Sequence, residues 1–444
     1  MSKRLAMALW IAAAGWVPQA AAGHSTGDES RGGPRSLAEP EQAGGAVSSA
    51  DPEDLIAPSA PSASALRLYG FADMSYSKVV SGGFGDDAHE VFSTIAGAPQ
   101  HWAFAVGNLN LYIDGQAGPR VRSLAEVRLT YLPSGSQNTT VPDYAQALAT
   151  TNWGGIVIER AWVEYAFSDL FTIRAGQFLT PYGIWNVDHG SPTTIAVQKP
   201  EIASAQLFPE RQVGVEAYGS RYLGDARLGY HLTVSNGRIG NNPPFANYSG
   251  RPGLGARFFV EGNWLGELQL GLSGYTGRYT ELQAGDTSIV PTPPDSIAVE
   301  YDEHDVAADV RWNWRRLLLV SEAVYQRVRY TDRGRPANVF IGPAGPVATP
   351  AADSWRAGSY ALAGFRLPFD VMPYVMWELI YQSTGINSGG LLFPSGLRAV
   401  VAGVNFRPLP TLVLKVQYDH IWAPNYPLSP NTMDFVRGQV AWAF

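Results

Sequence analysis

The chain has 444 residues, no cysteine and a formal net charge of −7 at pH 7. The absence of cysteine excludes a disulfide framework and a thiolate metal site, and the acidic balance argues against a nucleic-acid partner. Aromatic residues make up 12% of the chain, yet the mean hydropathy is only −0.08. This combination is typical of a barrel that is apolar outside and polar inside.

Residues 1–22 have the pattern of a cleaved signal peptide. Lys3 and Arg4 precede an apolar run over 5–17, and the small residues that follow predict cleavage after Ala22. The run is too short for a spanning helix, and no later segment offers the roughly 18 uninterrupted apolar residues that such a helix needs. We therefore expect an exported protein that stays in the bacterial outer membrane as a closed barrel.

Residues 23–65 are rich in Gly, Pro, Ala, Ser and acids and have few large apolar side chains. Such a segment buries too little surface to order itself, which predicts a disordered periplasmic leader. From Leu66 to Phe444 the sequence predicts an all-β, 16-stranded antiparallel transmembrane barrel. The predicted strands are 66–77, 101–115, 120–132, 154–167, 171–180, 211–220, 225–235, 252–263, 266–277, 303–314, 317–330, 354–367, 372–383, 397–408, 411–422 and 433–444.

Every second connection between these strands is only a few residues long, whereas the others are long and rich in Pro, Gly, Asn and Asp. Short periplasmic turns and long extracellular loops are the layout of outer-membrane barrels. Both ends of the chain are therefore predicted to lie on the periplasmic side. The last strand supports a barrel in lipid, because Val436, Gly438, Val440, Trp442 and Phe444 share one face, which would form part of the apolar outer wall. Its ending also resembles the C-terminal signal of bacterial outer-membrane proteins.

Charged and apolar residues alternate in several predicted strands, including 120–132, 225–235, 303–314 and 411–422. An Arg or Lys on the lipid face near the midplane costs about 2–4 kcal/mol, so the charges are predicted to face the lumen. The side chains predicted to line the pore are Arg122, Glu126, Arg128, Arg160, Glu164, Arg174, Glu216, Arg227, Arg257, Asp309, Arg311 and Lys415. Alternation is less regular in 66–77, 317–330 and 354–367, and the inward face of these strands stays open.

A 16-stranded barrel is too wide for its own side chains to fill. The third long connection, 181–210, carries apolar residues such as Ile184, Val187 and Leu207 that a solvent-facing loop tip has little use for. We expect this loop to fold inward and to form the constriction. Its candidate constriction residues are Tyr182, Trp185, Asp188, His189, Lys199 and Glu201.

Other classes of function fit less well. Adjacent residues of an extended chain point to opposite faces, so Asp188 and His189 make a poor catalytic pair. The seven histidines lack metal-ligand spacing, and there is no phosphate-binding loop or nucleophile elbow. No enzyme activity, cofactor or metal is expected. The alternative is a surface receptor or adhesin that acts through loops 81–100, 279–302 and 331–353. A receptor would need a folded N-terminal plug, for which 23–65 is too short and too polar.

Several motifs resemble the phosphate-selective porins (porin O/P) of bacterial outer membranes. They include Gly176-Gln177-Phe178, Pro181-Tyr182-Gly183 and Arg211-Gln212-Val213-Gly214-Val215, with LYGFADMSY at the barrel start and AGVNFRPLPTLVLKVQYDH near the end. The resemblance covers about 65–444. It implies a trimeric porin with an infolded third loop.

The function expected from all this is passive diffusion of small hydrophilic solutes, including anions such as phosphate. Selectivity in a pore follows from rings of like charge. Here the inward arginines are interleaved with acidic residues, and the predicted constriction loop is no more cationic than anionic. Preference for anions, preference for other small polar solutes and non-selective passage therefore remain open at this stage.

Overall fold

The fold was analysed in a computed structural model of the 444-residue chain. The structure describes residues 64–82, 103–134, 152–187, 190–204, 207–239, 250–282, 297–342, 345–383, 396–422 and 432–444. The predicted signal peptide and nearly all of the predicted leader lie outside these residues, and so do Asp188 and His189.

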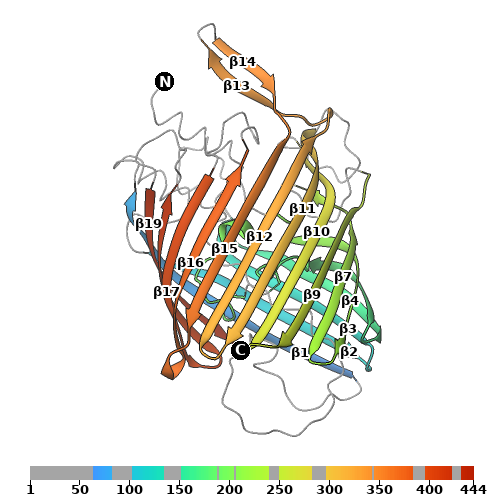
Figure 1. Ribbon diagram of the computed structural model, residues 1–444, viewed down its shortest axis with the longest axis vertical. Coiled ribbons are helices and arrows are strands. Elements are labelled where there is room, and N and C mark those ends of the chain that lie inside the picture. The colour runs from blue at the N-terminus through green and yellow to red at the C-terminus, as the bar shows by residue number, and fades with distance from the viewer. Residues whose placement is uncertain are drawn as a thin grey trace.

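Sixteen long antiparallel strands form a closed barrel (Figure 1). They are β1 (Ser64–Gly82), β2 (Ala103–Ala117), β3 (Val121–Ser134), β4 (Asn152–Ser168), β5 (Phe171–Leu179), β6 (Arg211–Leu223), β7 (Ala226–Ser235), β9 (Gly253–Asn263), β10 (Glu267–Leu282), β11 (Ile297–Trp314), β12 (Leu317–Tyr330), β15 (Ser354–Phe365), β16 (Val371–Gln382), β17 (Gly396–Leu409), β18 (Leu412–Trp422) and β19 (Thr432–Ala443).

The barrel closes where β19 pairs with β1, with Phe71 opposite Ala443. Two backbone hydrogen bonds of 2.9 Å, between Gly70 and Phe444, complete this seam. Ser64 of β1 lies opposite Ala117, next to the short β2–β3 turn. The first strand therefore begins, and the last one ends, at the short-turn end of the barrel, as predicted.

The predicted fold and all sixteen predicted strands are confirmed, with differences at their ends. β1, β10 and β11 extend several residues farther toward the long-loop end than expected. The structure also adds three short strands. β8 (Arg238–Ile239) pairs in parallel with β10, and β13 (Ala337–Gly342) and β14 (Gly345–Pro350) form a separate hairpin that projects beyond the rim of the barrel (Figure 1).

The two faces of the wall differ as the alternation predicts. On β18, Val416 and Tyr418 are exposed on the outer face, whereas Lys415, Gln417 and Asp419 are buried on the inner one. Outward aromatic side chains gather near both ends of the barrel, where the headgroups of a bilayer lie. They include Tyr222, Trp314, Phe365, Trp442 and Phe444 near the short turns and Tyr325, Trp355, Trp377 and Trp422 toward the long loops.

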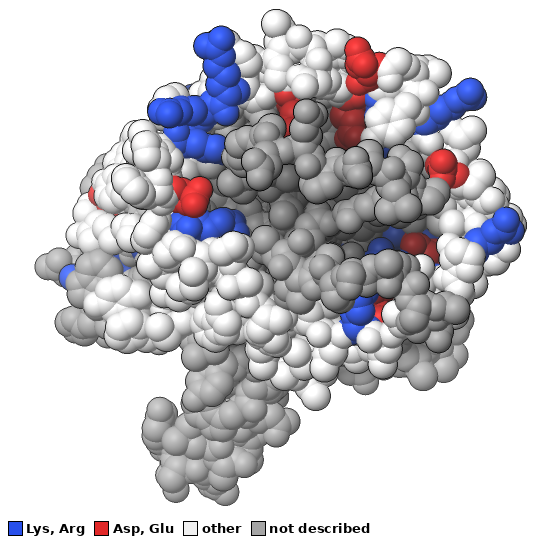
Figure 2. Space-filling model, turned by 90° about the horizontal axis from the view of Figure 1, so that it is seen from below, with Lys and Arg blue, Asp and Glu red and all other residues white. Residues whose placement is uncertain are grey.

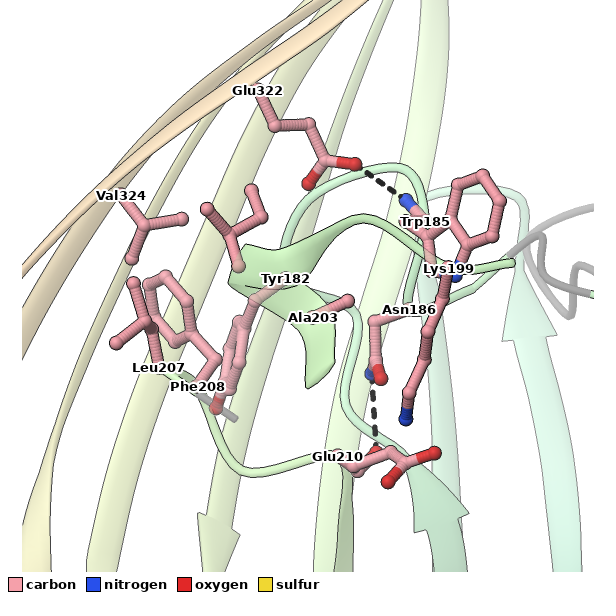
Figure 3. A pocket seen from close by; sticks show the side chains of 11 residues that line it. Tyr182, Trp185, Asn186, Lys199, Ala203, Leu207, Phe208, Glu210, Glu322 and Val324 are labelled. Atoms are coloured by element: carbon pink, nitrogen blue, oxygen red, sulfur yellow. Dashed lines mark hydrogen bonds between the residues drawn. The ribbon is translucent and has the colours of Figure 1, made fainter. Parts of the chain in front are cut away.

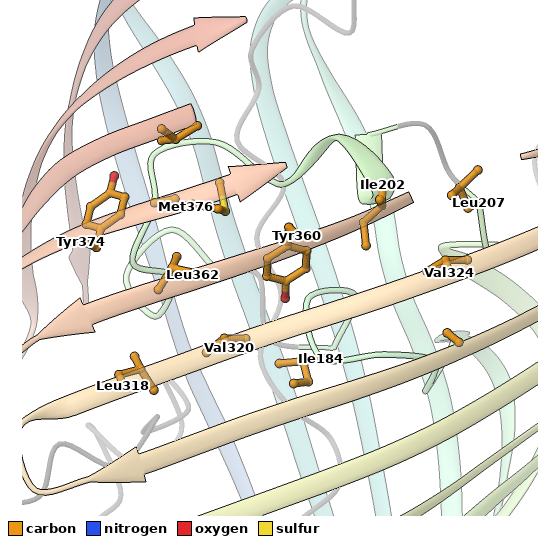
Figure 4. Packing of buried hydrophobic residues seen from close by; sticks show 13 residues of the cluster. Ile184, Ile202, Leu207, Leu318, Val320, Val324, Tyr360, Leu362, Tyr374 and Met376 are labelled. Carbon is orange, nitrogen blue, oxygen red and sulfur yellow. The ribbon is translucent and has the colours of Figure 1, made fainter. Parts of the chain in front are cut away.

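The inner face of β12 and β15–β17 is largely apolar, with Glu322, Gln326, Glu378 and Asn405 as buried polar exceptions. This explains the irregular alternation of the strand predicted over 317–330. Leu318, Val320 and Val324 of β12 point inward, where Ile184 and Leu207 of the connection between β5 and β6 pack against them (Figure 4). These strands are covered by lipid on one side and by protein on the other. The opposite inner wall, on β2–β7, is lined largely by charged and aromatic side chains.

In the part of the chain that the structure describes, the helical segments are α5 (Glu201–Ser204) and the 3-10 turn η2 (Pro368–Asp370). No helix among the described residues has the length and apolar character that spanning a membrane requires.

Candidate lumen and constriction loop

The chain between β5 and β6, residues 180–210, is called the third loop below. Its two ends are held together at the wall. The Thr180 backbone N–H donates to the Glu210 carbonyl at 3.1 Å, and the Asn186 amide donates to the carbonyls of Thr180 (2.7 Å) and Glu210 (3.1 Å). The loop therefore leaves and re-enters the sheet at one point.

The first part of the loop is held by side chains of β7, β9 and β12. The Tyr182 hydroxyl lies 2.6 Å from Thr233 Oγ1. Gly183 adopts φ +76°, its carbonyl accepts a hydrogen bond from Arg257, and a Cβ there would lie 2.0 Å from the Glu322 carboxylate. Glu322 Oε1 in turn accepts the Trp185 backbone N–H at 2.7 Å. Only glycine fits this turn without strain.

The middle of the loop reaches the opposite side of the barrel. Lys415 Nζ of β18 donates to the Ser191 carbonyl (2.7 Å), Thr194 Oγ1 (3.0 Å) and the Ala196 carbonyl (3.1 Å). Gln417 Oε1 accepts the Val197 N–H at 2.7 Å. Further contacts join Ser191 to Asp73 of β1, Thr194 and Ile195 to Asn405, and Pro192 to Arg407.

The returning part of the loop contains α5. The Glu201 N–H donates to Glu378 Oε2 of β16 at 2.6 Å, and the Leu207 carbonyl accepts the Gln326 amide at 2.8 Å. Burial raises the pKa of Glu201 to about 7, although Arg437 and Lys199 oppose this. Burial also lowers the pKa of Lys199, against the attraction of Glu210. Both loop charges are thus held in a poorly solvated place.

A cavity of about 40 Å³ lies between the loop and the wall (Figure 3). Tyr182, Trp185, Lys199 and Glu210 line it from the loop, and Glu322 and Val324 line it from β12. The space suits a few water molecules rather than a solute. This cavity is therefore a small gap in the packing of the loop against the wall and not a binding pocket for a solute.

Ion pairs between nearby strands cover the charged wall; most join adjacent strands, and Arg257–Asp309 spans β10. Arg160 Nε lies 2.6 Å from Glu126 Oε2, with both side chains almost fully buried. Arg174 bridges Glu164 (2.8 Å) and Glu216 (2.9 Å). Further pairs of 2.6–3.0 Å are Arg122–Asp114, Arg128–Glu159, Arg227–Glu261, Arg257–Asp309 and Arg437–Asp419.

The structure places the predicted pore-lining residues on the inner wall, and it pairs most of their charges with one another. Lys415 lies beneath the third loop, where the loop covers it, and Arg311 is partly exposed. Of the predicted constriction residues, Tyr182 is buried, and Trp185, Lys199 and Glu201 are partly exposed. Asp188 and His189 lie outside the described residues. A pore-lining or constricting role for these residues stays a prediction.

Sequence reasoning named Glu126, Glu164, Glu216 and Asp309, which pair with arginines, but it missed three other acidic side chains. Glu322 and Glu378 accept loop N–H groups, and Glu159 lies between Arg128 and Arg211. Glu159 and Arg160 are both buried because the register of β3 with β4 shifts next to them. The sequence does carry a signal for Glu322, because this acidic residue lies in a strand whose neighbouring residues are mostly apolar.

Viewed along the axis from the short-turn end, the barrel shows basic and acidic side chains near one another around its rim (Figure 2). Neither sign forms a continuous ring in this view. No group of three or more His, Asp or Glu side chains that could hold a metal occurs among the described residues.

Residues 129–308 match the family model of the phosphate-selective porins O and P, which confirms the resemblance seen in the sequence. Solved structures with the same fold include OmpT of Vibrio cholerae (8% identity, TM-score 0.53, 87% of this chain and 99% of that chain). They also include the channel DcaP of Acinetobacter baumannii (12%, 0.51, 86% and 97%) and an anion-selective porin from Comamonas acidovorans (10%, 0.51, 86% and 100%). No curated protein matches the sequence. The family match and the barrel together support an outer-membrane channel.

Proposed function

We propose that this protein is a passive outer-membrane porin for small hydrophilic solutes, anions such as phosphate among them, and that residues 181–210 set its width. A closed wall of sixteen strands encloses more space than its inward side chains fill. The inner wall on β2–β7 is charged and the outer wall is apolar, as a water-filled channel in lipid requires. No energy source or cofactor is needed for diffusion.

The observation that supports the proposal most strongly is the set of hydrogen bonds that holds the third loop against the inner wall. It is bonded to inward side chains of β1, β7, β9, β12, β16, β17 and β18, among them Asp73, Thr233, Glu322, Glu378 and Lys415. A loop that is tied to so many strands across the barrel narrows the passage permanently. Its apolar side chains Ile184 and Leu207 add burial against β12, which keeps water from displacing it.

The ion pairs of the wall bear on selectivity. Arg160, Arg174 and Arg257 each have a carboxylate partner within 3.0 Å, so their charge is largely compensated at short range. A bare ladder of arginines would favour anions strongly, because selectivity follows from like charges that act together. The compensated wall therefore favours a weak preference, with phosphate admitted rather than concentrated.

The test is reconstitution of the purified full-length protein in planar bilayers. Stepwise conductance in KCl is expected, with a small reversal potential across a salt gradient that shifts little when phosphate replaces chloride. Liposome swelling with uncharged sugars should show uptake that declines with sugar size. The proposal would be contradicted by a protein that is shown to be folded by its heat-modifiable mobility in gel electrophoresis and yet neither conducts ions nor makes liposomes swell.

A second candidate function is a surface receptor, because the β13–β14 hairpin projects beyond the barrel (Figure 1). Deletion of 337–350 should leave conductance unchanged if the barrel is a porin. If the protein is a receptor, the variant without residues 337–350 should lose binding to its ligand or to cell surfaces, and neither the wild type nor the variant should conduct ions.

Export by a signal peptide cleaved after Ala22 and assembly into a homotrimer complete the proposal. The trimer is supported by a structural neighbour, Vibrio cholerae OmpT, one structure of which is described as a trimer form. Mass spectrometry of the mature N-terminus and of the intact assembly tests both points.

A further inference from the structure

The outer face of the barrel carries a group of arginines at the long-loop ends of β10, β11 and β12. Arg327 and Arg329 of β12 are exposed, and both lie on the face opposite to the buried Gln326, Val328 and Tyr330. These two side chains therefore point away from the lumen, into the surroundings of the barrel.

The sheet register brings further polar residues beside them. Asp302 of β11 lies opposite Arg329 on one side and opposite Arg278 of β10 on the other. Asp302 accepts two hydrogen bonds from Arg278, at 2.7 and 3.0 Å, and Arg251 lies 3.9 Å away. The group of Arg251, Arg278, Asp302, Arg327 and Arg329, called the outer arginine patch, thus holds four arginines and one aspartate. The neighbouring Glu300 lies 3.6 Å from Arg278 and is itself paired with Arg333 at 2.5 Å, so the group is net positive.

Asp302 is hydrogen-bonded to Arg278, and the side chains of Arg327 and Arg329 are exposed to solvent. Within the described residues, the side chains of Arg327 and Arg329 form no ion pair or hydrogen bond. A planar guanidinium that is exposed and unpaired is well suited to bind phosphate through two parallel hydrogen bonds.

The height of the patch on the wall points to the kind of ligand. Tyr325 lies two residues nearer the short-turn end on the same outer face, and Trp355 of β15 lies beside Arg327, its partner in the register. The rings of Tyr325 and Trp355 stack with their centroids 6.2 Å apart. From Leu317, at the short-turn end of β12, to Arg327 is ten residues, or about 33 Å of strand. With a tilt of about 40° this rises about 25 Å, which is the height of the apolar band of an outer-membrane barrel.

We propose that the outer arginine patch binds the phosphorylated headgroup of an outer-leaflet glycolipid. The rings of Tyr325 and Trp355, below and beside the patch, contact the acyl–headgroup boundary, and the arginines meet the phosphates at its upper edge. Charge complementarity and position both favour a lipid over a free ion, because the patch faces the bilayer and not the lumen. The lipid would stabilise this sector of the barrel from outside, independently of conduction.

The experiment measures binding of diphosphoryl lipid A to the full-length protein in detergent by native mass spectrometry. The double variant Arg327→Gln/Arg329→Gln should bind about thirtyfold more weakly, and added NaCl should weaken wild-type binding. Dephosphorylated lipid should bind wild type and double variant alike. Arg398→Gln is the matched control, because Arg398 is exposed near the same end of β17 and donates to Tyr381 instead of joining the patch.

Heat-modifiability shows that each variant is folded, and the two single variants replace the double variant if it is not. Unchanged lipid A binding by the arginine variants would overturn the proposal, as would an equal loss in Arg398→Gln. Binding of inorganic phosphate as tight as that of lipid A would indicate a free-ion site and overturn it as well. Dissociation of oligomers in the double variant would assign the patch to a contact between copies of the chain, which also contradicts the proposal.

Discussion

The charge of the third loop should make the selectivity of the channel depend on pH near neutrality. Burial raises the pKa of Glu201 to about 7. A carboxylic acid is neutral below its pKa and negative above it, so Glu201 gains its charge as the pH rises. Between pH 6 and pH 8 its ionised fraction goes from about one tenth to about nine tenths, a change of about 0.8 charges.

The size of the effect follows from Coulomb's law. A unit charge about 5 Å from a permeating ion in water contributes about 0.8 kcal/mol, and screening at about 0.1 M salt reduces this to about 0.5 kcal/mol. The change favours cations and disfavours anions by similar amounts. The ratio of cation to anion permeability should therefore rise about fourfold from pH 6 to pH 8.

Reversal potentials across a KCl gradient, measured at half-unit steps of pH, give this ratio directly. The Glu201→Gln variant should show a clearly weaker dependence on pH than the wild type; a residual dependence is expected from the neighbouring acid Glu378, which accepts the N–H of residue 201. Asp225→Asn, in the exposed β6–β7 turn, is the control and should keep the wild-type profile. The reasoning is refuted if Glu201→Gln retains the full pH dependence or if the wild-type ratio falls as the pH rises.

Three further substitutions test the packing. Gly183→Ala places a Cβ against the Glu322 carboxylate at a positive φ and should loosen the loop, seen as noisier single-channel currents. Arg160→Met leaves Glu126 buried without its ion pair and should lower the free energy of unfolding in urea by about 3–5 kcal/mol. The double variant Arg160→Met/Glu126→Leu should lower it much less, and equal losses in the two variants would contradict the pairing. Leu207→Ala, at a fully buried side chain, should destabilise the seated loop by about 2–5 kcal/mol, measured by protease accessibility of the loop, and unchanged cleavage would argue against the packing.

The sequence predicts the barrel well because its wall faces two different solvents. Wherever lipid lies on one side and polar groups on the other, as on β7 and β18, alternation reveals the strand and its inward face. The same logic fails on β12. There Leu318 and Val320 point inward to the third loop and not to water, so the strand is apolar on both faces.

Register explains why the charge pairs and the anchors of the loop escaped prediction. Arg174 lies opposite Glu164 on one neighbour and Glu216 on the other, and only this alignment turns three inward charges into one compensated group. Glu322 and Glu378 hold the loop through its backbone N–H groups, which carry no signal in the sequence. Arg327 and Arg329 break the rule that charges face the lumen, because they lie above the apolar band.

The most direct test of the account is the single-channel conductance of a variant whose third loop is shortened. The backbone of Thr180 is hydrogen-bonded to that of Glu210 at 3.1 Å, so the two ends of the loop are close, and residues 184–207 can be replaced by a short Gly-Ser linker without straining the sheet. Deletion of the β13–β14 hairpin over 337–350 provides the control for loop removal in general. We expect a clearly larger conductance only in the shortened-loop variant, whereas wild-type conductance in a folded variant would contradict a constriction formed by residues 181–210.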